Sequence, residues 1–399
     1  MGHGRNHYYN GVTAGRTTRC CSAVALISCC AAAIVAAAKP DRTPLLLFPT
    51  RPLWTLALGN QLTVPPAYDA TRVIFSIEGD RIVCYEMLSG TQQWLVTARP
   101  QMEPVAGDGL LFLVEPEALT ALHVEDGSMA WQLPFTEPLV VRPVWDNGWL
   151  VVSTSAGSVL AFRATDGHLI WSRDLGSPAH ARPALAADRV YVSTQNARVV
   201  ALNVADGAQV WERRLGGAPN EILALDERLY VGAKDNYFYC LMTRDGRVDW
   251  KWRTGGDVIG VPAFDEANVY FVSLDNVLRA LNRKSGGQKW LRALPFRPAW
   301  APAKVGGTIV VAGQASSLRA YTIADGQSAG EVEASAEIAA AVHVGENSST
   351  ALPTLLIVTR DIAKGAAGVL VTRSIEPKSS PITALPNPPI PLPTLPPIS

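Results

Sequence analysis

The residues best suited to catalysis form no recognisable catalytic pattern in this sequence. His123, His168, His180 and His343 are scattered along the chain, and none belongs to a recognisable triad. The sequence has no G-x-S-x-G nucleophile elbow, no phosphate-binding P-loop and no H-E-x-x-H zinc motif. Its six cysteines include no C-x-x-C pair and no Cys/His spacing of a metal site. We therefore predict neither catalytic nor metal-ligating residues.

Two arginines are better candidates for binding. Arg142 and Arg182 are each followed by proline and are separated by about 40 residues, the length of a structural repeat. Neighbouring guanidinium groups can hold an acidic partner group or a small anion. The alternative interpretation is solvated charge at the ends of strands. Tryptophan side chains also anchor interfaces, or simply add packing, and the second set of candidates comprises Trp145, Trp149, Trp252 and Trp300.

The spacing of the arginines belongs to a repeat that runs through most of the chain. Glycines recur at intervals of about 40 residues, at Gly90, Gly127, Gly167, Gly207, Gly246, Gly286 and Gly326. A tryptophan stands at the fourth position after each of the first six glycines, at Trp94, Trp131, Trp171, Trp211, Trp250 and Trp290. A period of this length indicates a solenoid, a propeller or a similar array.

Each period contains short β-rich runs separated by polar turns. In residues 181–215 the runs 190–193, 199–203 and 209–213 predict strands, without a helix between them. Asp206-Gly207 is typical of a two-residue hairpin turn in which both central residues have positive φ. We expect the glycine to close this turn and the tryptophan to seal each sheet against the next. Four strands in about 40 residues are typical of a β-propeller blade.

Counting the repeats predicts an all-β, eight-bladed β-propeller of four-stranded antiparallel blades. Seven blades are internal, and Trp54 lies one period before Trp94 with no matching turn upstream. Strand-like runs at 338–344, 354–359 and 368–375 supply three strands of an eighth blade. We expect the N-terminal strand with Trp54 to complete it, which leaves no open sheet edge. Cys84 and Cys240 occupy the small-residue position six before the glycine, on opposite sides of the ring, so no disulfide can join them.

The small residue, the Gly six positions later and the Trp four beyond it resemble the docking motif of PQQ-like, or quinoprotein-like, propeller repeats. "ALNVADGAQVW" (201–211) carries the pattern, and the likeness covers about residues 51–376. The usual Asp at the third position is replaced in some repeats, for example by Arg163. The usual Thr before the glycine is mostly Asp. These departures affect turns only.

Within these repeats the chain is most similar to the BamB family of outer-membrane assembly lipoproteins. That resemblance implies a non-enzymatic scaffold whose partner is the barrel-assembly machinery, and we carry over no contact residues. The alternative is a propeller that binds PQQ, or another small ligand, and acts as a quinone-dependent dehydrogenase. Such enzymes have long insertions, whereas every internal period here is short and nearly uniform. Adjacent cysteines occur only near the N-terminus. We therefore predict no cofactor.

The ends of the chain predict targeting and tail segments around the propeller. Residues 1–38 resemble an export signal or lipoprotein leader, since an apolar stretch follows arginines and no acid. Lipidation at Cys29, cleavage after Ala38 and an uncleaved anchor all remain open. Each places the body in the cell envelope, on the periplasmic side. We expect a linker at 39–50, the propeller at 51–376 and a proline-rich, disordered tail at 377–399.

Charge excludes one class of partner. Lys and Arg together number 35, as do Asp and Glu, so the chain has no net charge to attract nucleic acid.

Overall fold

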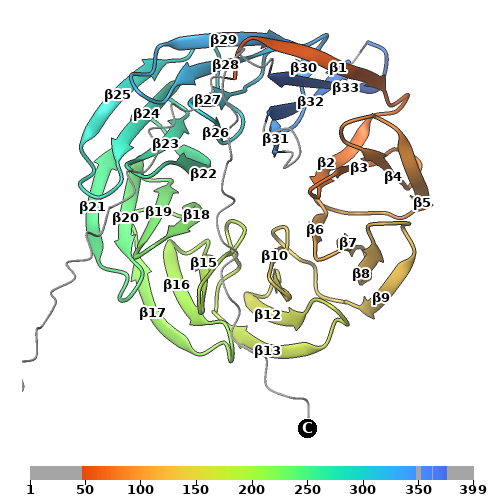
Figure 1. Cartoon of the computed structure of the whole chain (residues 1–399). Helices are drawn as coiled ribbons and strands as arrows, with labels where there is room; N and C mark the ends of the chain where they lie inside the picture. Colours follow the sequence, from red (N-terminus) through yellow and green to blue (C-terminus); the bar gives the residue numbers. More distant parts are fainter. Residues whose placement is uncertain (1–46, 347–351, 362, 375–399) are drawn as a thin grey trace, which may run out of the picture. The chain divides into compact units, whose positions relative to one another are not determined.

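Eight β-sheets are arranged around a common axis in a computed structural model of the protein (Figure 1). The structure describes residues 47–346, 352–361 and 363–374. The predicted leader with Cys29, most of the predicted linker and the proline-rich tail lie outside the described residues. None of the described residues forms a helix that is long and apolar enough to span a membrane.

Seven sheets are consecutive four-stranded antiparallel blades, which we number 1 to 7. From the innermost to the outermost strand, blades 1 to 4 are β2 (Leu62–Tyr68), β3 (Arg72–Ile77), β4 (Arg81–Glu86), β5 (Gln92–Thr97); β6 (Val105–Gly107), β7 (Leu110–Glu115), β8 (Ala118–His123), β9 (Met129–Pro134); β10 (Val144–Asp146), β11 (Trp149–Ser153), β12 (Ser158–Arg163), β13 (Leu169–Asp174); β14 (Ala184–Ala186), β15 (Arg189–Ser193), β16 (Arg198–Asn203), β17 (Gln209–Arg214). Blades 5 to 7 are β18 (Pro219–Leu225), β19 (Arg228–Ala233), β20 (Tyr237–Met242), β21 (Val248–Arg253); β22 (Val258–Phe264), β23 (Asn268–Ser273), β24 (Val277–Asn282), β25 (Gln288–Ala293); β26 (Ala303–Val305), β27 (Thr308–Val311), β28 (Ser317–Thr322), β29 (Ser328–Glu333).

The eighth blade joins the two ends of the described chain, as predicted. Its strands are β30 (Glu337–Ile338), β31 (His343–Glu346), β32 (Pro353–Asp361), β33 (Ala366–Ser374) and β1 (Thr50–Ala57). The outermost strand, β1, pairs antiparallel with β33, and Trp54 faces Val371. The innermost strand is split, because β30 and β31 both pair with β32. The prediction of eight blades closed by the N-terminal strand is therefore confirmed.

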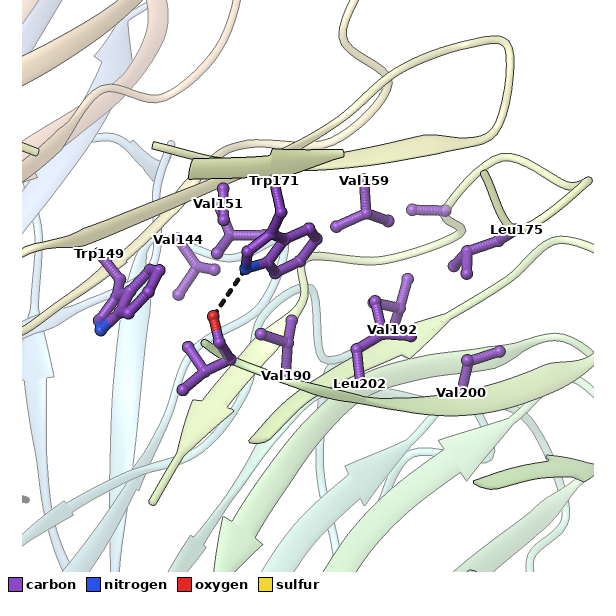
Figure 2. Packing of buried hydrophobic residues seen from close by; sticks show 13 residues of the cluster. Val144, Trp149, Val151, Val159, Trp171, Leu175, Val190, Val192, Val200 and Leu202 are labelled. Atoms are coloured by element: carbon purple, nitrogen blue, oxygen red, sulfur yellow. Dashed lines mark hydrogen bonds between the residues drawn. The ribbon is translucent and has the colours of Figure 1, made fainter. Parts of the chain in front are cut away.

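The hydrophobic core lies between neighbouring blades. One cluster combines Trp149, Val151 and Trp171 of blade 3 with Val190 and Val192 of blade 4 (Figure 2). This arrangement follows from the sequence pattern, because the middle strands of each blade are apolar on both faces and both faces meet another blade.

Each docking tryptophan reaches the third turn of the following blade. The indole Nε1 of Trp171 donates a hydrogen bond of 2.7 Å to the backbone carbonyl oxygen of Val204 (Figure 2). In every case the acceptor stands at the third position before the docking glycine, which is Gly207 in this blade. The equivalent bonds run from Trp54 to Met87, Trp94 to Val124, Trp131 to Ala164, Trp211 to Thr243, Trp250 to Arg283 and Trp290 to Ile323.

Gly207 is required beneath the tryptophan for two separate reasons. Its φ of 67° lies in the left-handed region that glycine tolerates best. A Cβ atom added to it would lie 2.6 Å from Cε3 of Trp171. The small residue of the motif has its own role, since Ala201 faces Trp211 across the strand pair and leaves room for the ring. Cys84 and Cys240 face Trp94 and Trp250 in the same way; both are buried and free, as expected.

The predicted geometry of the Asp-Gly turn is wrong. Only Gly207 has a positive φ, and Asp206 does not. The N–H of Gly207 donates to the carbonyl of Asn203, while the carboxylate of Asp206 accepts the N–H of Ala208. A β-bulge in the β16–β17 pair lengthens this connection, so the Asp stabilises the loop through its side chain and needs no special φ. In blades 2 and 3, turns with positive φ at both central residues join the two innermost strands, at Asp108-Gly109 and Asn147-Gly148.

Candidate interaction surface

The predicted arginine pair is part of a larger group of charges around the propeller axis. Arg142 and Arg182 lie just before the innermost strands of their blades, β10 and β14. Each stands four residues before the last residue of that strand. The equivalent positions are Glu103 in blade 2 and Glu221 in blade 5. We call these four residues the charged arc. In blades 1, 6 and 7 the equivalent positions hold the uncharged residues Val64, Gly260 and Ala301, so the charges at this position belong to the consecutive blades 2 to 5.

Each arginine of the charged arc is paired with a carboxylate of the neighbouring blade, on the side away from the other arginine. Arg142 forms a salt bridge with Glu103, and Nε of Arg182 lies 3.4 Å from Oε1 of Glu221. The four side chains are 27–31% exposed. The order around the axis is therefore Glu, Arg, Arg, Glu, with the two like charges in the middle. Within the described part of the chain, Arg182 has no second salt-bridge partner.

Burial disfavours the charged forms of Glu103 and Arg182 in the charged arc, and the two arginines also repel each other. Burial lowers the pKa of Arg182, and the positive charge of Arg142 lowers it further, although both glutamates act against this change. Burial also raises the pKa of Glu103, despite the opposing charges of Arg142 and Arg182. An additional carboxylate placed between the arginines would relieve their repulsion and satisfy free guanidinium N–H donors.

The tryptophans proposed as a second set of binding residues all pack against the cores between blades, and of the four only Trp149 is fully buried. Trp149 is 2% exposed within the core between blades 3 and 4 (Figure 2). The ring of Trp145 lies over Gly107 of the neighbouring innermost strand, where an added Cβ would be 2.1 Å from the ring. Trp252 packs in the core between blades 5 and 6, and Trp300 in that between blades 7 and 8. These contacts favour packing, whereas binding by these tryptophans stays a prediction, and the charged arc is the other candidate surface.

The four histidines among the described residues lie in four different blades or their connections. His123 and His168 are exposed near the docking turns. The His343 ring in blade 8 stacks on that of Tyr68 in blade 1, with centroids 3.8 Å apart, and burial lowers its pKa to about 4. Burial, followed by the charge of Lys234, lowers the pKa of His180. Among the described residues, no group of three or more His, Cys, Asp or Glu side chains could hold a metal ion.

Two further kinds of residue, which we did not predict from the sequence, are brought together by the fold. Glu103 stands about one period before Arg142, and Glu221 about one period after Arg182. This spacing in the sequence could have indicated that the two glutamates belong with the arginines.

A second series of residues stands at the second position after the docking tryptophans. In blades 3, 4 and 6 this position holds an arginine whose Nε donates to the carbonyl of the docking glycine: Arg173 to Gly207, Arg213 to Gly246 and Arg292 to Gly326.

Eight four-stranded blades, docked through repeated Trp–Gly contacts, define the chain as a β-propeller of the PQQ-like type. The chain belongs to the family described as outer membrane protein assembly factor BamB, whose profile matches residues 49–142, 134–225 and 223–354. No curated protein sequence matches it.

Solved structures with little sequence identity share the fold. BamB from Moraxella catarrhalis is 18% identical, with a TM-score of 0.64 over 81% of this chain and 99% of that one. A quinohemoprotein alcohol dehydrogenase from Pseudomonas putida is 12% identical, with a TM-score of 0.64 over 85% and 78% of the two chains. The computationally designed Ika8 protein is 13% identical, with a TM-score of 0.68 over 80% and 99%. At these identities the likeness extends to the fold alone.

Proposed function

We propose that this protein is a non-enzymatic scaffold of the bacterial cell envelope that assists the assembly of outer-membrane β-barrel proteins. The observation that carries the proposal is the BamB family match, which extends through residues 49–354 and so spans most of the propeller. The uniform blade length supports it, because consecutive blades leave little chain for loops that could enclose a substrate. In this proposal the body lies on the periplasmic side, with Cys29 as the candidate lipid anchor.

The charged arc is the proposed contact site for a protein partner of the assembly machinery. Its neutral sum and Glu–Arg–Arg–Glu order suit a partner segment that brings an acidic side chain between the two arginines. Charges of this kind fix the register of an interface and add affinity when they are desolvated. Arg142 and Arg182 are the residues that would contact the partner carboxylate.

Co-purification tests the proposed role. The full chain should retain the barrel-forming subunit of the assembly machinery from envelope extracts. Arg182→Glu should weaken this binding at least 10-fold, about 1.4 kcal/mol, because it replaces a guanidinium with a third carboxylate. Arg244→Glu is the matched control, since Arg244 is 68% exposed on its side chain and outside the charged arc. Equal binding by both variants would remove the charged arc from the interface, and absence of the subunit with the unaltered chain would refute the assembly role.

Quinone binding provides a separate test of the non-enzymatic assignment. We expect no saturable binding when the purified chain is titrated with pyrroloquinoline quinone and calcium, and no reduction of an acceptor dye when alcohols or sugars are added. Saturable binding with dye reduction would replace the scaffold proposal with a dehydrogenase.

A further inference from the structure

The junction between blades 7 and 8 differs from the other seven junctions. In blade 6, Trp290 faces Ala280 and docks on blade 7. In blade 7 the equivalent pair is Ala320 with Gly330, so a glycine occupies the position of the tryptophan. The outermost strand of blade 7 therefore carries no tryptophan at the docking position.

An aromatic ring from the opposite side fills this position. A Cβ atom added to Gly330 would lie 2.6 Å from Cγ and Cδ1 of Phe48, so the Phe48 ring lies directly on the glycine backbone. The neighbouring Leu47 is fully buried in the core between blades 7 and 8, in a cluster with Val332 and Ile338. Both residues fall in the segment that we predicted as linker, and both pack in the propeller.

The topology of blade 8 explains why the aromatic ring at this junction comes from the blade 8 side. At the other junctions the tryptophan docks on the turn between the third and fourth strands of the next blade. In blade 8 these strands are β33 and β1, which belong to opposite ends of the described chain, so no turn connects them. The docking glycine and its carbonyl acceptor are therefore missing from blade 8. The residues immediately before β1 take their place and bring the aromatic ring with them.

We propose that Leu47 and Phe48 form a latch that holds the ring of blades closed. When these two residues dissociate from blade 7, the propeller opens first between blades 7 and 8. Three features concentrate opening at this junction. It lacks the indole hydrogen bond of the other seven, its aromatic side chain comes from a short segment before β1 and not from a strand, and no turn connects β33 and β1. Closure of the propeller thus depends on two residues that precede its first strand.

A double-mutant cycle in the full chain tests the contact. Gly330→Ala alone introduces a methyl group against Phe48 and strains a residue with φ of 149°. The backbone strain remains when Phe48 is changed to Ala, but the clash does not. We expect the loss in the folding equilibrium constant caused by Gly330→Ala to be at least 5-fold smaller in the Phe48→Ala background. Equal losses in both backgrounds would show that Phe48 does not dock on Gly330.

Hydrogen exchange tests whether the junction is where the ring opens. Phe48→Ala should accelerate amide exchange at least 10-fold in β29 and β1, with little change in blades 3 and 4. The matched control is Trp171→Phe, which should accelerate exchange around the 204–208 loop and leave β29 unchanged. Uniform acceleration around the ring in Phe48→Ala would overturn the latch, because Phe48 would then add only to global stability.

Discussion

All eight junctions between blades place an aromatic ring against a glycine, but one of them takes the ring from the other blade of the pair. At the seven, a tryptophan on an outermost strand docks on a glycine turn of the next blade. At the eighth, a glycine on the outermost strand receives Phe48 from the next blade. An aromatic side chain packed against a glycine backbone is therefore the contact that all eight junctions share. Which blade supplies the aromatic side chain depends on where the chain ends.

The seven docked junctions also differ in the residue that contacts the docking glycine beside the tryptophan. Arg173, Arg213 and Arg292 add a charge-assisted hydrogen bond to the glycine carbonyl. In blades 1 and 2 the same position holds Val96 and Leu133, which pack against the docking glycine instead. The tryptophan contact is thus constant, and its neighbour can be polar or apolar.

The largest effect should come from removing a docked ring. Trp171 is 8% exposed and contributes both burial and the bond to Val204. Trp171→Ala should therefore destabilise the fold by about 3–5 kcal/mol, measured by urea unfolding. If the loss were no larger than that of Phe48→Ala, whose ring is only half-buried, the distinction between docked and latched junctions would fail.

A smaller loss is expected when the glycine beneath the ring gains a methyl group. Gly207→Ala adds a steric clash to backbone strain and should cost about 3 kcal/mol. Gly176 is the matched control, because its φ of 65° is nearly the same and nothing lies within 4 Å of an added Cβ. Gly176→Ala should cost about 1 kcal/mol for strain alone. Similar losses in the two variants would show that the close approach of Trp171 does not select glycine.

An ion pair at the opposite end of the strands tests whether docking alone holds the ring. Burial would raise the pKa of Asp275, but hydrogen bonds from Arg279, Ser273 and the N–H of Gly255 lower it to about 2. The ordinary pKa of an Asp carboxyl is 3.8, so the ionised carboxylate stabilises the fold above pH 3.8 and loses this contribution as the pH falls towards 2. Asp275→Asn should therefore cost about 2 kcal/mol at pH 7.

The pH profile provides the check on this prediction. The difference in unfolding free energy between Asp275→Asn and the unaltered protein should decrease between pH 4 and pH 2. A difference that stayed constant over this range would mean that the charge of Asp275 does not stabilise the fold.

The smallest effect should come from the arginines that complete some docked junctions. Arg173→Met keeps the aliphatic stem and removes the 2.8 Å bond from Nε to the Gly207 carbonyl. We expect a loss of about 1 kcal/mol, measured by urea unfolding. Arg51→Met is a suitable control, since Arg51 is exposed and has no place in a docked junction. Equal effects would show that Trp171 alone seals this junction.

Much of the architecture followed from the sequence because its signal is periodic. The spacing from Trp54 to Gly326 predicted the blade count, and the β-rich runs near the C-terminus indicated the composite blade. The docking turn was predicted incorrectly, because Asp206 acts through its carboxylate and the adjoining bulge is not visible in the residue types. Of the charged arc, only Arg142 and Arg182 were recognised. Their partners Glu103 and Glu221 are not in the same hairpins and meet them only when the blades surround the axis.

The repeat by itself determined the blade, its strand order and the residues that dock, since each of these depends on chemistry that recurs in every period. Only the tertiary structure decided how the ring closes and what fills its last junction. Phe48 stands in an unrepeated segment before the first blade, and no local pattern relates it to Gly330 near the other end of the propeller. Closing the ring brings them together, because the eighth blade must bury the same apolar face as the other seven without a turn to dock on.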